Sequence, residues 1–259
     1  MGYVFDFKDA QDYEAGLDTP LNRYCMDLEL KLFLKMMDPK PGQRILDIGC
    51  GTGVSLVPLL DPDLGRLDLT GLDPSPYVLD LAFDRLGERV DLHRGTAEDL
   101  PFDDNAFETA FFFNSLEYTD RPAKALEEAC RVAKDQVIIA VHNRNALLNM
   151  LRRFKGYFLP GRFAHARFFG IWELKRMMAN ILGRVPVTWR TTLQFPFLRG
   201  PWAAWTENLP WVQRSCFGTL LVMRIKPVPT FRTRPLSLKI RTRKLYTPRG
   251  LVTGYRLGD

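Results

Sequence analysis

Cysteine and histidine are scarce in this sequence, and neither forms a recognisable site. The 259 residues contain four cysteines, with no C-x-x-C pair, and three widely spaced histidines. Structural disulfides and a structural zinc site are therefore not expected, and no metal site is predicted. The same cysteine usage favours a reducing, cytoplasmic location.

Long apolar runs are a second absence. No stretch of about 18 uncharged apolar residues occurs, so no membrane-spanning helix is predicted. Residues 1–9 contain acidic and aromatic side chains where a secretory signal would have a basic and then an apolar segment. The length and an apolar content of 46% suit one large globular α/β domain with additions.

Positive charge is concentrated at one end of the chain. The net charge is +6, and residues 226–259 contain nine basic residues and one acidic residue. The preceding 225 residues contain 27 basic and 29 acidic residues and are nearly neutral. The sequence thus predicts an almost uncharged body followed by a basic arm.

The most informative segment is the decapeptide at 44–53, R-I-L-D-I-G-C-G-T-G. Its apolar residues suit a buried parallel strand, and the three glycines allow a turn that a ligand can approach closely. A helix should begin near Val54. Asp47, just before the turn, would attract a ligand ammonium group and repel a phosphate, which favours a zwitterionic ligand. Alternatively, Asp47 only caps the following helix.

This decapeptide resembles motif I of the class I S-adenosylmethionine (SAM) methyltransferases, and the family's later motifs follow in order. They are L-T-G-L-D-P-S at 69–75, L-H-R-G-T-A-E-D-L-P-F at 92–102, D-N-A-F-E-T-A-F-F-F-N-S-L-E-Y at 104–118 and A-L-E-E-A-C-R-V at 125–132. Over residues 10–225 the chain is similar to the type 11 group, which includes ubiquinone and menaquinone methyltransferases and many unassigned small-molecule enzymes.

The resemblance implies a Rossmann-like α/β fold with a seven-stranded, mostly parallel sheet, one antiparallel strand and helices on both faces. Strands are expected near 44–48, 67–72, 90–94, 107–113, 136–142, 185–193 and 216–225, the last two as an antiparallel hairpin. A largely apolar helix should end at Asp38-Pro39, and another helix should cover 171–182.

Three regions are predicted: an N-terminal helical cap at 1–40, a SAM-binding domain at 41–225 and the basic arm at 226–259. Two insertions in the domain, at 143–169 and 194–215, are rich in aromatic residues, and the first is also basic. These insertions either roof the pocket of an apolar or anionic acceptor or form a satellite core with solvated arginines.

The family's motifs imply the cofactor site. Asp73 would bind the ribose hydroxyls, residues 96–98 would flank the adenine, and an N-terminal tyrosine, Tyr13 or Tyr24, would reach over the cofactor. Thr96 stands where the family usually has an aspartate that contacts the adenine amino group. An alternative role for Asp73 is to begin a turn with the following proline. The expected cofactor-binding residues are Tyr13, Asp47, Gly49, Cys50, Gly51, Gly53, Asp73, Pro74, Ser75, Thr96, Ala97, Glu98 and Asn114.

Catalysis of methyl transfer depends largely on aligning the acceptor, and a base is needed only where the acceptor must lose a proton. Glu117 and Tyr118 follow the fourth strand, where the family often has two histidines, and His142 ends the fifth strand. These three are the catalytic candidates. Alternatively, Glu117 is a helix-start carboxylate and His142 a hydrogen-bonded structural residue. The N/D-P-P-F/Y motif of exocyclic amino methylation is absent.

The expected function is SAM-dependent methyl transfer to a small, partly apolar acceptor. The alternatives are an RNA or protein methyltransferase that uses the basic arm, and a non-catalytic SAM-binding subunit. The arm is expected either to form a short β-ribbon on the body or on a second subunit, or to be a disordered tail. As a ribbon it would meet an anionic partner such as a membrane surface or nucleic acid.

Overall fold

The computed structural model describes residues 2–17, 19–151, 165–194, 205–207 and 209–227. The chain divides into two units, 1–228 and 229–259. The second unit contains most of the predicted basic arm and lies outside the described residues, as do parts of both predicted insertions. Within the described residues, no helix is both long enough and apolar enough to cross a membrane.

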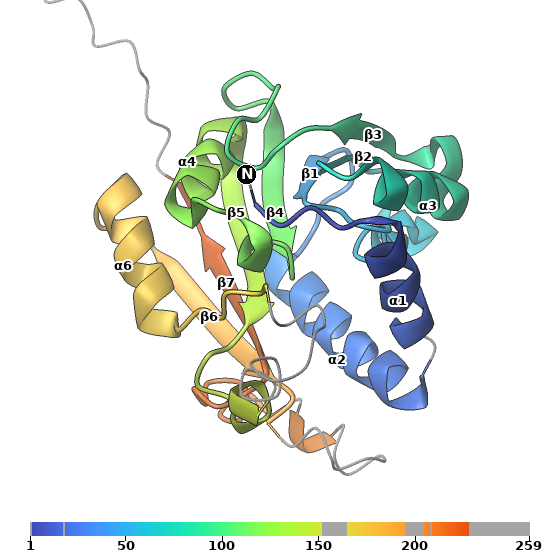
Figure 1. Cartoon of the computed structure of the whole chain (residues 1–259). Coiled ribbons are helices and arrows are strands. Elements are labelled where there is room, and N and C mark those ends of the chain that lie inside the picture. Colours follow the sequence, from blue (N-terminus) through green and yellow to red (C-terminus); the bar gives the residue numbers. More distant parts are fainter. Residues whose placement is uncertain (1, 18, 152–164, 195–204, 208, 228–259) are drawn as a thin grey trace, which may run out of the picture. The chain divides into compact units, whose positions relative to one another are not determined.

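The first unit is built on a seven-stranded sheet of order β3-β2-β1-β4-β5-β7-β6 (Figure 1). The strands are β1 Arg44–Ile48, β2 Asp68–Asp73, β3 Asp91–Arg94, β4 Phe107–Phe113, β5 Ala133–His142, β6 Val187–Thr192 and β7 Leu220–Ile225. Only β7 runs antiparallel to its neighbours, β5 and β6. The predicted sheet, its single antiparallel strand and its final hairpin are confirmed.

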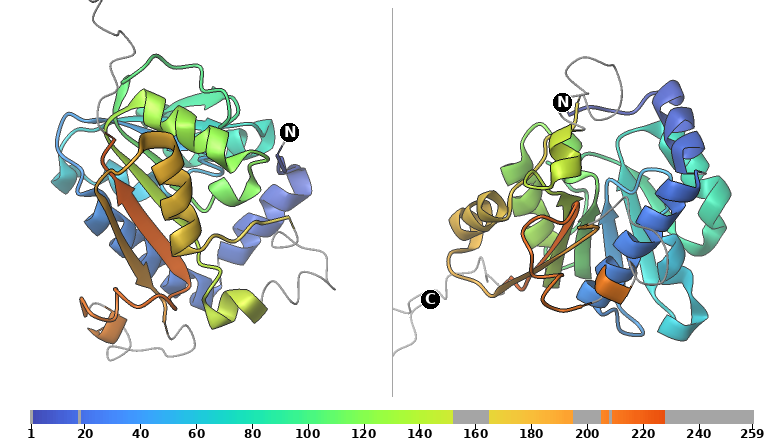
Figure 2. Two further views of the ribbon diagram at one scale, coloured as in Figure 1. Left: turned by 90° about the vertical axis from the view of Figure 1, so that its left-hand side faces the viewer. Right: turned by 90° about the horizontal axis from the view of Figure 1, so that it is seen from below.

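Helices cover both faces of this sheet, as Figure 2 shows from two further directions. They are α1 Phe7–Leu17, α2 Pro20–Met37, α3 Pro76–Leu86, α4 Pro122–Val132 and α6 Ile171–Leu182. Because successive side chains of a strand point to opposite faces, β1 contributes to two core clusters. Leu46 and Ile48 pack in the cluster with α4 and α6, and Ile45 packs in the cluster with α2 and α3. Burial on both faces explains why β1 has no alternation of polar and apolar residues.

The segment after β1 differs from expectation. No helix begins near Val54; the chain forms turns and two short 3-10 helices, η1 Val57–Leu60 and η2 Pro62–Leu64. The prediction of a helix there is wrong. Pro58 lacks the N–H that would bond to the carbonyl of Val54 in an α-helix, and Pro62 interrupts the next turn. Leu56 and Leu59 are nevertheless buried beside α2 and α3, so the turns still close the core.

The other element boundaries follow local chemistry. Helix α2 has Thr19 as its N-cap and Asp38 as its C-cap, in a left-handed conformation with φ 52°, so the predicted end at Asp38-Pro39 is confirmed. Strand β5 begins at Ala133, directly after α4 and three residues earlier than expected. Strands β6 and β7 are each shorter than expected.

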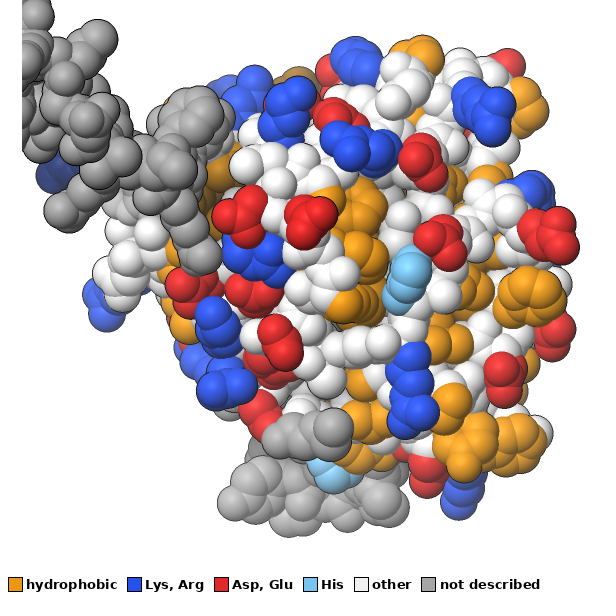
Figure 3. Space-filling model, turned by 90° about the horizontal axis from the view of Figure 1, so that it is seen from above, with side chains coloured by type: hydrophobic (Ala, Val, Ile, Leu, Met, Phe, Trp, Pro, Cys, Tyr) orange, Lys and Arg blue, Asp and Glu red, His pale blue; other side chains and the backbone are white. Residues whose placement is uncertain are grey.

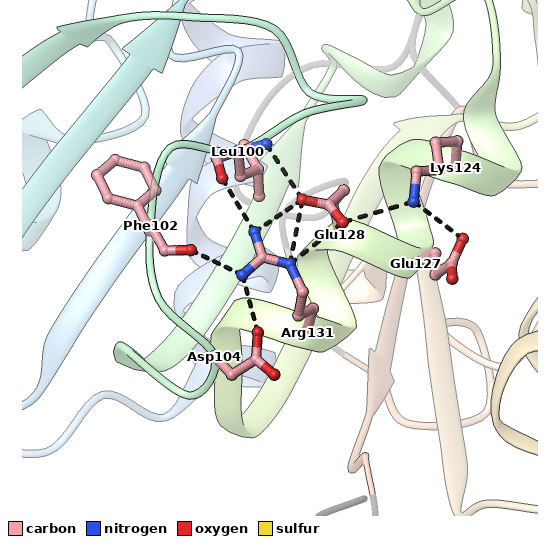
Figure 4. A network of polar contacts seen from close by, with 7 residues as sticks. All are labelled: Leu100, Phe102, Asp104, Lys124, Glu127, Glu128 and Arg131. Carbon is pink, nitrogen blue, oxygen red and sulfur yellow. Dashed lines mark hydrogen bonds and ion pairs between the residues drawn. The ribbon is translucent and has the colours of Figure 1, made fainter. Parts of the chain in front are cut away.

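The A-L-E-E-A-C-R-V segment holds a loop in place from α4 (Figure 4). Arg131 donates hydrogen bonds to the carbonyl oxygens of Leu100 and Phe102 at 2.9 and 2.7 Å and to the carboxylate of Asp104 at 3.0 Å. Glu128 pairs with Arg131 at 2.8 Å and accepts a bond from the Leu100 N–H. This network fixes the segment that follows residues 96–98.

Candidate active site

A pocket opens at the carboxyl ends of β1, β2, β4 and β5, which is where ligands bind in sheets of this topology. It encloses about 1530 Å³, counting its mouth. We call its two walls the loop side and the strap side. The loop side consists of Gly49, Cys50, Gly51, Thr52, Asp73, Pro74, Val78, Thr96, Ala97, Glu98 and Asn114, and the strap side of Gly2, Tyr3, Val4, Phe5, Tyr118 and His142.

The glycine turn shapes the loop side. Gly51 has φ 52°, in the left-handed region, and a Cβ added there would meet no atom within 4 Å. This glycine therefore leaves open space for a ligand against the backbone. Gly49, with φ 77°, is needed for another reason: an added Cβ would lie 2.5 Å from the Cβ of Ser115. The Ser115 hydroxyl also donates to the Ile48 carbonyl at 2.6 Å, so the loops after β1 and β4 touch.

Asp73 ends β2 beside this turn. One carboxylate oxygen accepts the N–H of Gly51 at 3.0 Å and the other accepts the N–H of Ser75 at 2.9 Å. Each oxygen has a second lone pair, so Asp73 can still accept hydroxyl donors from a ligand. Burial raises the pKa of this carboxyl to about 6.

Asp47 lies beneath the turn and does not line the pocket. It is fully buried, and the Ser55 hydroxyl donates to one of its oxygens. Its other oxygen, Oδ1, has no partner within the described residues. Burial raises the pKa of Asp47 to about 8, and the nearby charge of Asp73 adds to the shift. A cation brought close to this site would favour the ionised form.

Residues Gly2–Phe5 cross the strap side, and we call them the N-terminal strap. The Tyr3 N–H donates to the Tyr118 carbonyl at 3.0 Å, and the Ser75 hydroxyl donates to the Phe5 carbonyl at 2.6 Å. The Tyr3 ring stacks on His165 with centroids 4.1 Å apart, and the Phe5 ring meets Tyr118 edge-on at 5.1 Å. The strap thus gives the pocket an aromatic wall.

Glu117 and His142 form a pair at the base of the strap side. The carboxylate of Glu117 accepts the backbone N–H of His142 at 2.7 Å and contacts Nδ1 of the ring at 3.1 Å. Glu117 is buried and does not line the pocket, whereas His142 does. The Phe168 ring packs edge-on against the imidazole with centroids 5.7 Å apart. A carboxylate bonded to Nδ1 is the arrangement that orients an imidazole as a base.

Most of the predicted cofactor residues line this one pocket. The pocket lining does not include three of the predicted cofactor residues, Asp47, Gly53 and Ser75. It also lacks the catalytic candidate Glu117 and Tyr24, the alternative to Tyr13. Helix α2 contributes Asn22, Cys25, Met26 and Glu29, which the sequence did not suggest. The strap residues Tyr3 and Phe5 were also missed; their alternating aromatic pattern before the first helix was the only available signal.

The described parts of the predicted insertions pack beside the pocket without lining it. In the first, Phe168 and Phe169 are buried, and Arg144 and Arg167 bond to Glu173 on α6. None of the described residues of either insertion lines the pocket. Residues 152–164 and 195–204, including Trp202, lie outside the described residues, so the roofing role of the insertions stays a prediction.

The exposed charges show no single sign on the face drawn in Figure 3, where basic and acidic side chains are interspersed around apolar ones. Among the described residues, no group of three or more histidine, cysteine or acidic side chains is placed to hold a metal.

Comparison with known proteins agrees with this geometry. The family model described as Methyltransferase domain, type 11, matches residues 46–141, which hold the glycine turn, Asp73 and the strands up to β5. Residues 46–141 belong to the type 11 methyltransferase family. The demethylmenaquinone methyltransferase of Paenarthrobacter aurescens is 34% identical over 108 residues, which are 40% of each chain. The match thus spans well under half of that relative.

Solved structures extend the likeness in fold to most of the chain. A Thermotoga maritima SAM-dependent methyltransferase, described as a possible histamine N-methyltransferase, superposes with a TM-score of 0.66 and 24% identity over 86% of this chain and 97% of the other. The magnesium protoporphyrin IX methyltransferase of Synechocystis, solved with bound S-adenosylhomocysteine (SAH), gives a TM-score of 0.55 and 13% identity over 80% and 84% of the two chains. The fold is that of the class I methyltransferases, whose members bind SAM or SAH.

The residues present fit SAM. The ligand has an ammonium group and two ribose hydroxyls, all donors, and the loop side offers acceptors. Asp73 retains lone pairs, and Oδ1 of Asn114 is buried at the pocket wall with no partner in the described chain. Asp47, beneath the turn, would ionise as the ligand's positive charge approaches, and Gly51 leaves that approach open.

Proposed function

We propose that the protein is a SAM-dependent methyltransferase for a small, partly apolar acceptor whose hydroxyl loses a proton to His142. The observation that carries the proposal is the Glu117–His142 pair, which places an oriented imidazole on the wall of the pocket that also holds the glycine turn and Asp73. A structural histidine would not need to face that pocket.

When bound, SAM supplies a methyl group on a reactive sulfonium. Asp73, Asn114 and the backbone around Gly51 hold the ligand on the loop side, with Asp47 favouring its positive charge. The aromatic strap excludes water from the neighbouring space and packs against a flat, apolar acceptor. Holding both molecules in one pocket supplies the alignment on which most of the rate depends.

His142 then acts as general base. With Nδ1–H directed at Glu117, the nitrogen that takes a proton is Nε2. This nitrogen removes the acceptor's hydroxyl proton as the methyl group is transferred, and Glu117 stabilises the imidazolium that results. The proton later passes to solvent. The products are SAH and the methylated acceptor.

The acceptor class we propose is a hydroxylated aromatic ring, of the hydroquinone kind. Three aromatic side chains, Tyr3, Phe5 and Tyr118, line the strap side, and removal of a phenolic proton would raise the nucleophilicity of both the oxygen and the ring carbons. The demethylmenaquinone methyltransferase similarity agrees with this class.

The test combines binding and transfer. SAH should bind the full chain in a calorimetric titration, and SAM with a labelled methyl group should label one product in a lipid and metabolite extract. His142→Gln should lower turnover by about 10²–10⁴-fold and leave SAH affinity unchanged. His93→Gln, an exposed histidine on β3, is the matched control and should behave as the parent protein. Absence of SAH binding would refute the methyltransferase assignment, and full turnover in His142→Gln would refute the base.

A further inference from the structure

A second hollow lies between α4 and α6, outside the pocket described above. It encloses about 1310 Å³, counting its open mouth, and we call it the α4–α6 groove. Its lining contains five basic side chains and one acidic side chain, Glu173. The basic residues are Arg121, Lys124, Arg144, Arg167 and Arg176. In a body whose total charge is close to zero, this is a local concentration of positive charge.

The ion pairs of the groove do not cancel this charge. Arg144 and Arg167 share the carboxylate of Glu173, at 2.6 and 2.8 Å, so two guanidinium groups meet one negative charge. Lys124 is balanced by Glu127 at 3.3 Å. The side chains of Arg121 and Arg176 are exposed. The amino end of α4, at Pro122 and Ala123, also lines the groove and adds the positive end of its dipole.

An exposed indole stands among these cations. Trp172, on the first turn of α6, is 75% exposed and lines the groove with Met177 one to two turns along the helix. Tryptophan beside arginine and lysine is the composition of protein surfaces that rest at the headgroup level of a bilayer.

The groove shares a wall with the active site. The carbonyl of Phe168 accepts two bonds from Arg144, at 3.0 and 2.8 Å, while the ring of Phe168 packs on His142. The N–H of Arg167 donates to the carbonyl of Glu117 at 2.9 Å. A surface bound at the groove would therefore lie close to the acceptor side of the pocket.

We propose that the α4–α6 groove binds phosphate headgroups of an anionic lipid bilayer and holds the protein at a membrane surface. The arginines take the phosphates, and Trp172 enters the headgroup layer. The inference stands apart from the proposed function, because lipid binding is measured without an acceptor. If both hold, an apolar acceptor dissolved in the bilayer would be delivered to the strap side.

The experiment is flotation of the full chain with vesicles of phosphatidylcholine alone or with added phosphatidylglycerol, at low and high salt. Binding should require phosphatidylglycerol and weaken with salt. Since a basic residue near anionic lipid contributes about fivefold, Arg121→Gln with Arg176→Gln should weaken binding about 25-fold. Lys31→Gln with Lys35→Gln, exposed on α2, is the matched control and should leave binding unchanged. SAH binding, kept by all variants, reports folding.

Three results would overturn the proposal. The first is equal flotation of the groove variant and the parent protein. The second is loss of flotation in Arg241→Gln with Arg243→Gln while the groove variant keeps it, which assigns lipid binding to the arm. The third is binding of inorganic phosphate that requires Arg121 and Arg176, together with no binding of vesicles. That result would make the groove a site for a small phosphate ligand. Quenching of Trp172 fluorescence by brominated phosphatidylglycerol, lost in Trp172→Phe, would support the lipid.

Discussion

The two sides of the pocket are built by different means. The loop side comes mainly from three turns that each follow a strand, and its key contacts are made by backbone groups around Gly51 and Ser75. The strap side is assembled from residues near 3, 118, 142 and 165, which are far apart in the chain and meet through side chains. The loop side therefore suits a cofactor that is shared by proteins of this fold. The strap side suits an acceptor that differs from one such protein to another.

The largest effect concerns Asp47, the buried carboxyl under the loop side. Its pKa is raised to about 8 by burial, so the folded state keeps a proton that the unfolded chain, with the ordinary value of 3.8, has already released. Its contribution to stability is thus fully present below about pH 4 and is lost as the pH rises through 8. Between pH 5 and 8 the parent protein should lose about 4 kcal/mol in the free energy of unfolding through this residue.

Asp47→Asn should remove most of that pH dependence, measured by urea unfolding at several pH values. Asp68→Asn, an exposed residue at the start of β2, should keep it. Parallel stability profiles for Asp47→Asn and the parent protein would show that the buried carboxyl is not the source.

The second largest effect concerns Asp73 and distinguishes binding of SAH from binding of the acceptor. Asp73→Asn should weaken SAH binding by about 3 kcal/mol, on the order of 100-fold, because a charged acceptor of two hydroxyls is lost. Calorimetric titration measures it, with Asp91→Asn on the neighbouring strand as the control. If Asp73→Asn raised only the acceptor KM, the assignment of the two sides would be reversed.

A smaller effect is expected from removing Arg131, the α4 residue that holds the segment after residues 96–98. Arg131→Met leaves Glu128 with only the more distant Lys124, 3.6 Å away, and frees the carbonyls of Leu100 and Phe102. We expect a loss of about 2 kcal/mol in unfolding free energy, below the value for a fully buried pair because Arg131 keeps some contact with water. Chemical denaturation gives the measurement, and Lys134→Met, an exposed change nearby, should be close to neutral.

The smallest effect is expected on the strap side. The Tyr3 hydroxyl donates to Asp9 at 2.6 Å, a bond that raises the pKa of Tyr3 to about 12. Tyr3→Phe should loosen the strap by about 1 kcal/mol and raise the acceptor KM about fivefold, with SAH affinity unchanged. Tyr77→Phe, on the exposed face of α3, is the control. An equal change in SAH affinity would mean that the strap serves the cofactor.

The contrast between the two sides also explains what the sequence could predict. The strands and the loop side follow from local patterns, because a buried parallel strand, a glycine turn and an acidic residue each occupy a few consecutive residues. The helix expected near Val54 was wrong because Pro58 removes a helical hydrogen bond, a local signal that the family pattern outweighed.

The strap side could be predicted only in part. Glu117 and His142 were each identified from their positions after strands, but their hydrogen bond depends on how the loop after β4 packs against β5. Tyr3 and Phe5 were missed because nothing in residues 1–9 indicates the tertiary contacts with Tyr118 and His165.

The contact between Gly49 and Ser115 has a consequence for how the two ligands bind. No side chain would fit between the two loops at Gly49, and the loops share a hydrogen bond through Ile48, so a shift of one loop should displace the other. A molecule that pressed on Asn114 from the strap side would therefore be expected to change the space around Gly51. Affinity for the first ligand should then depend on the second, and by thermodynamic reciprocity the two dependences must be equal.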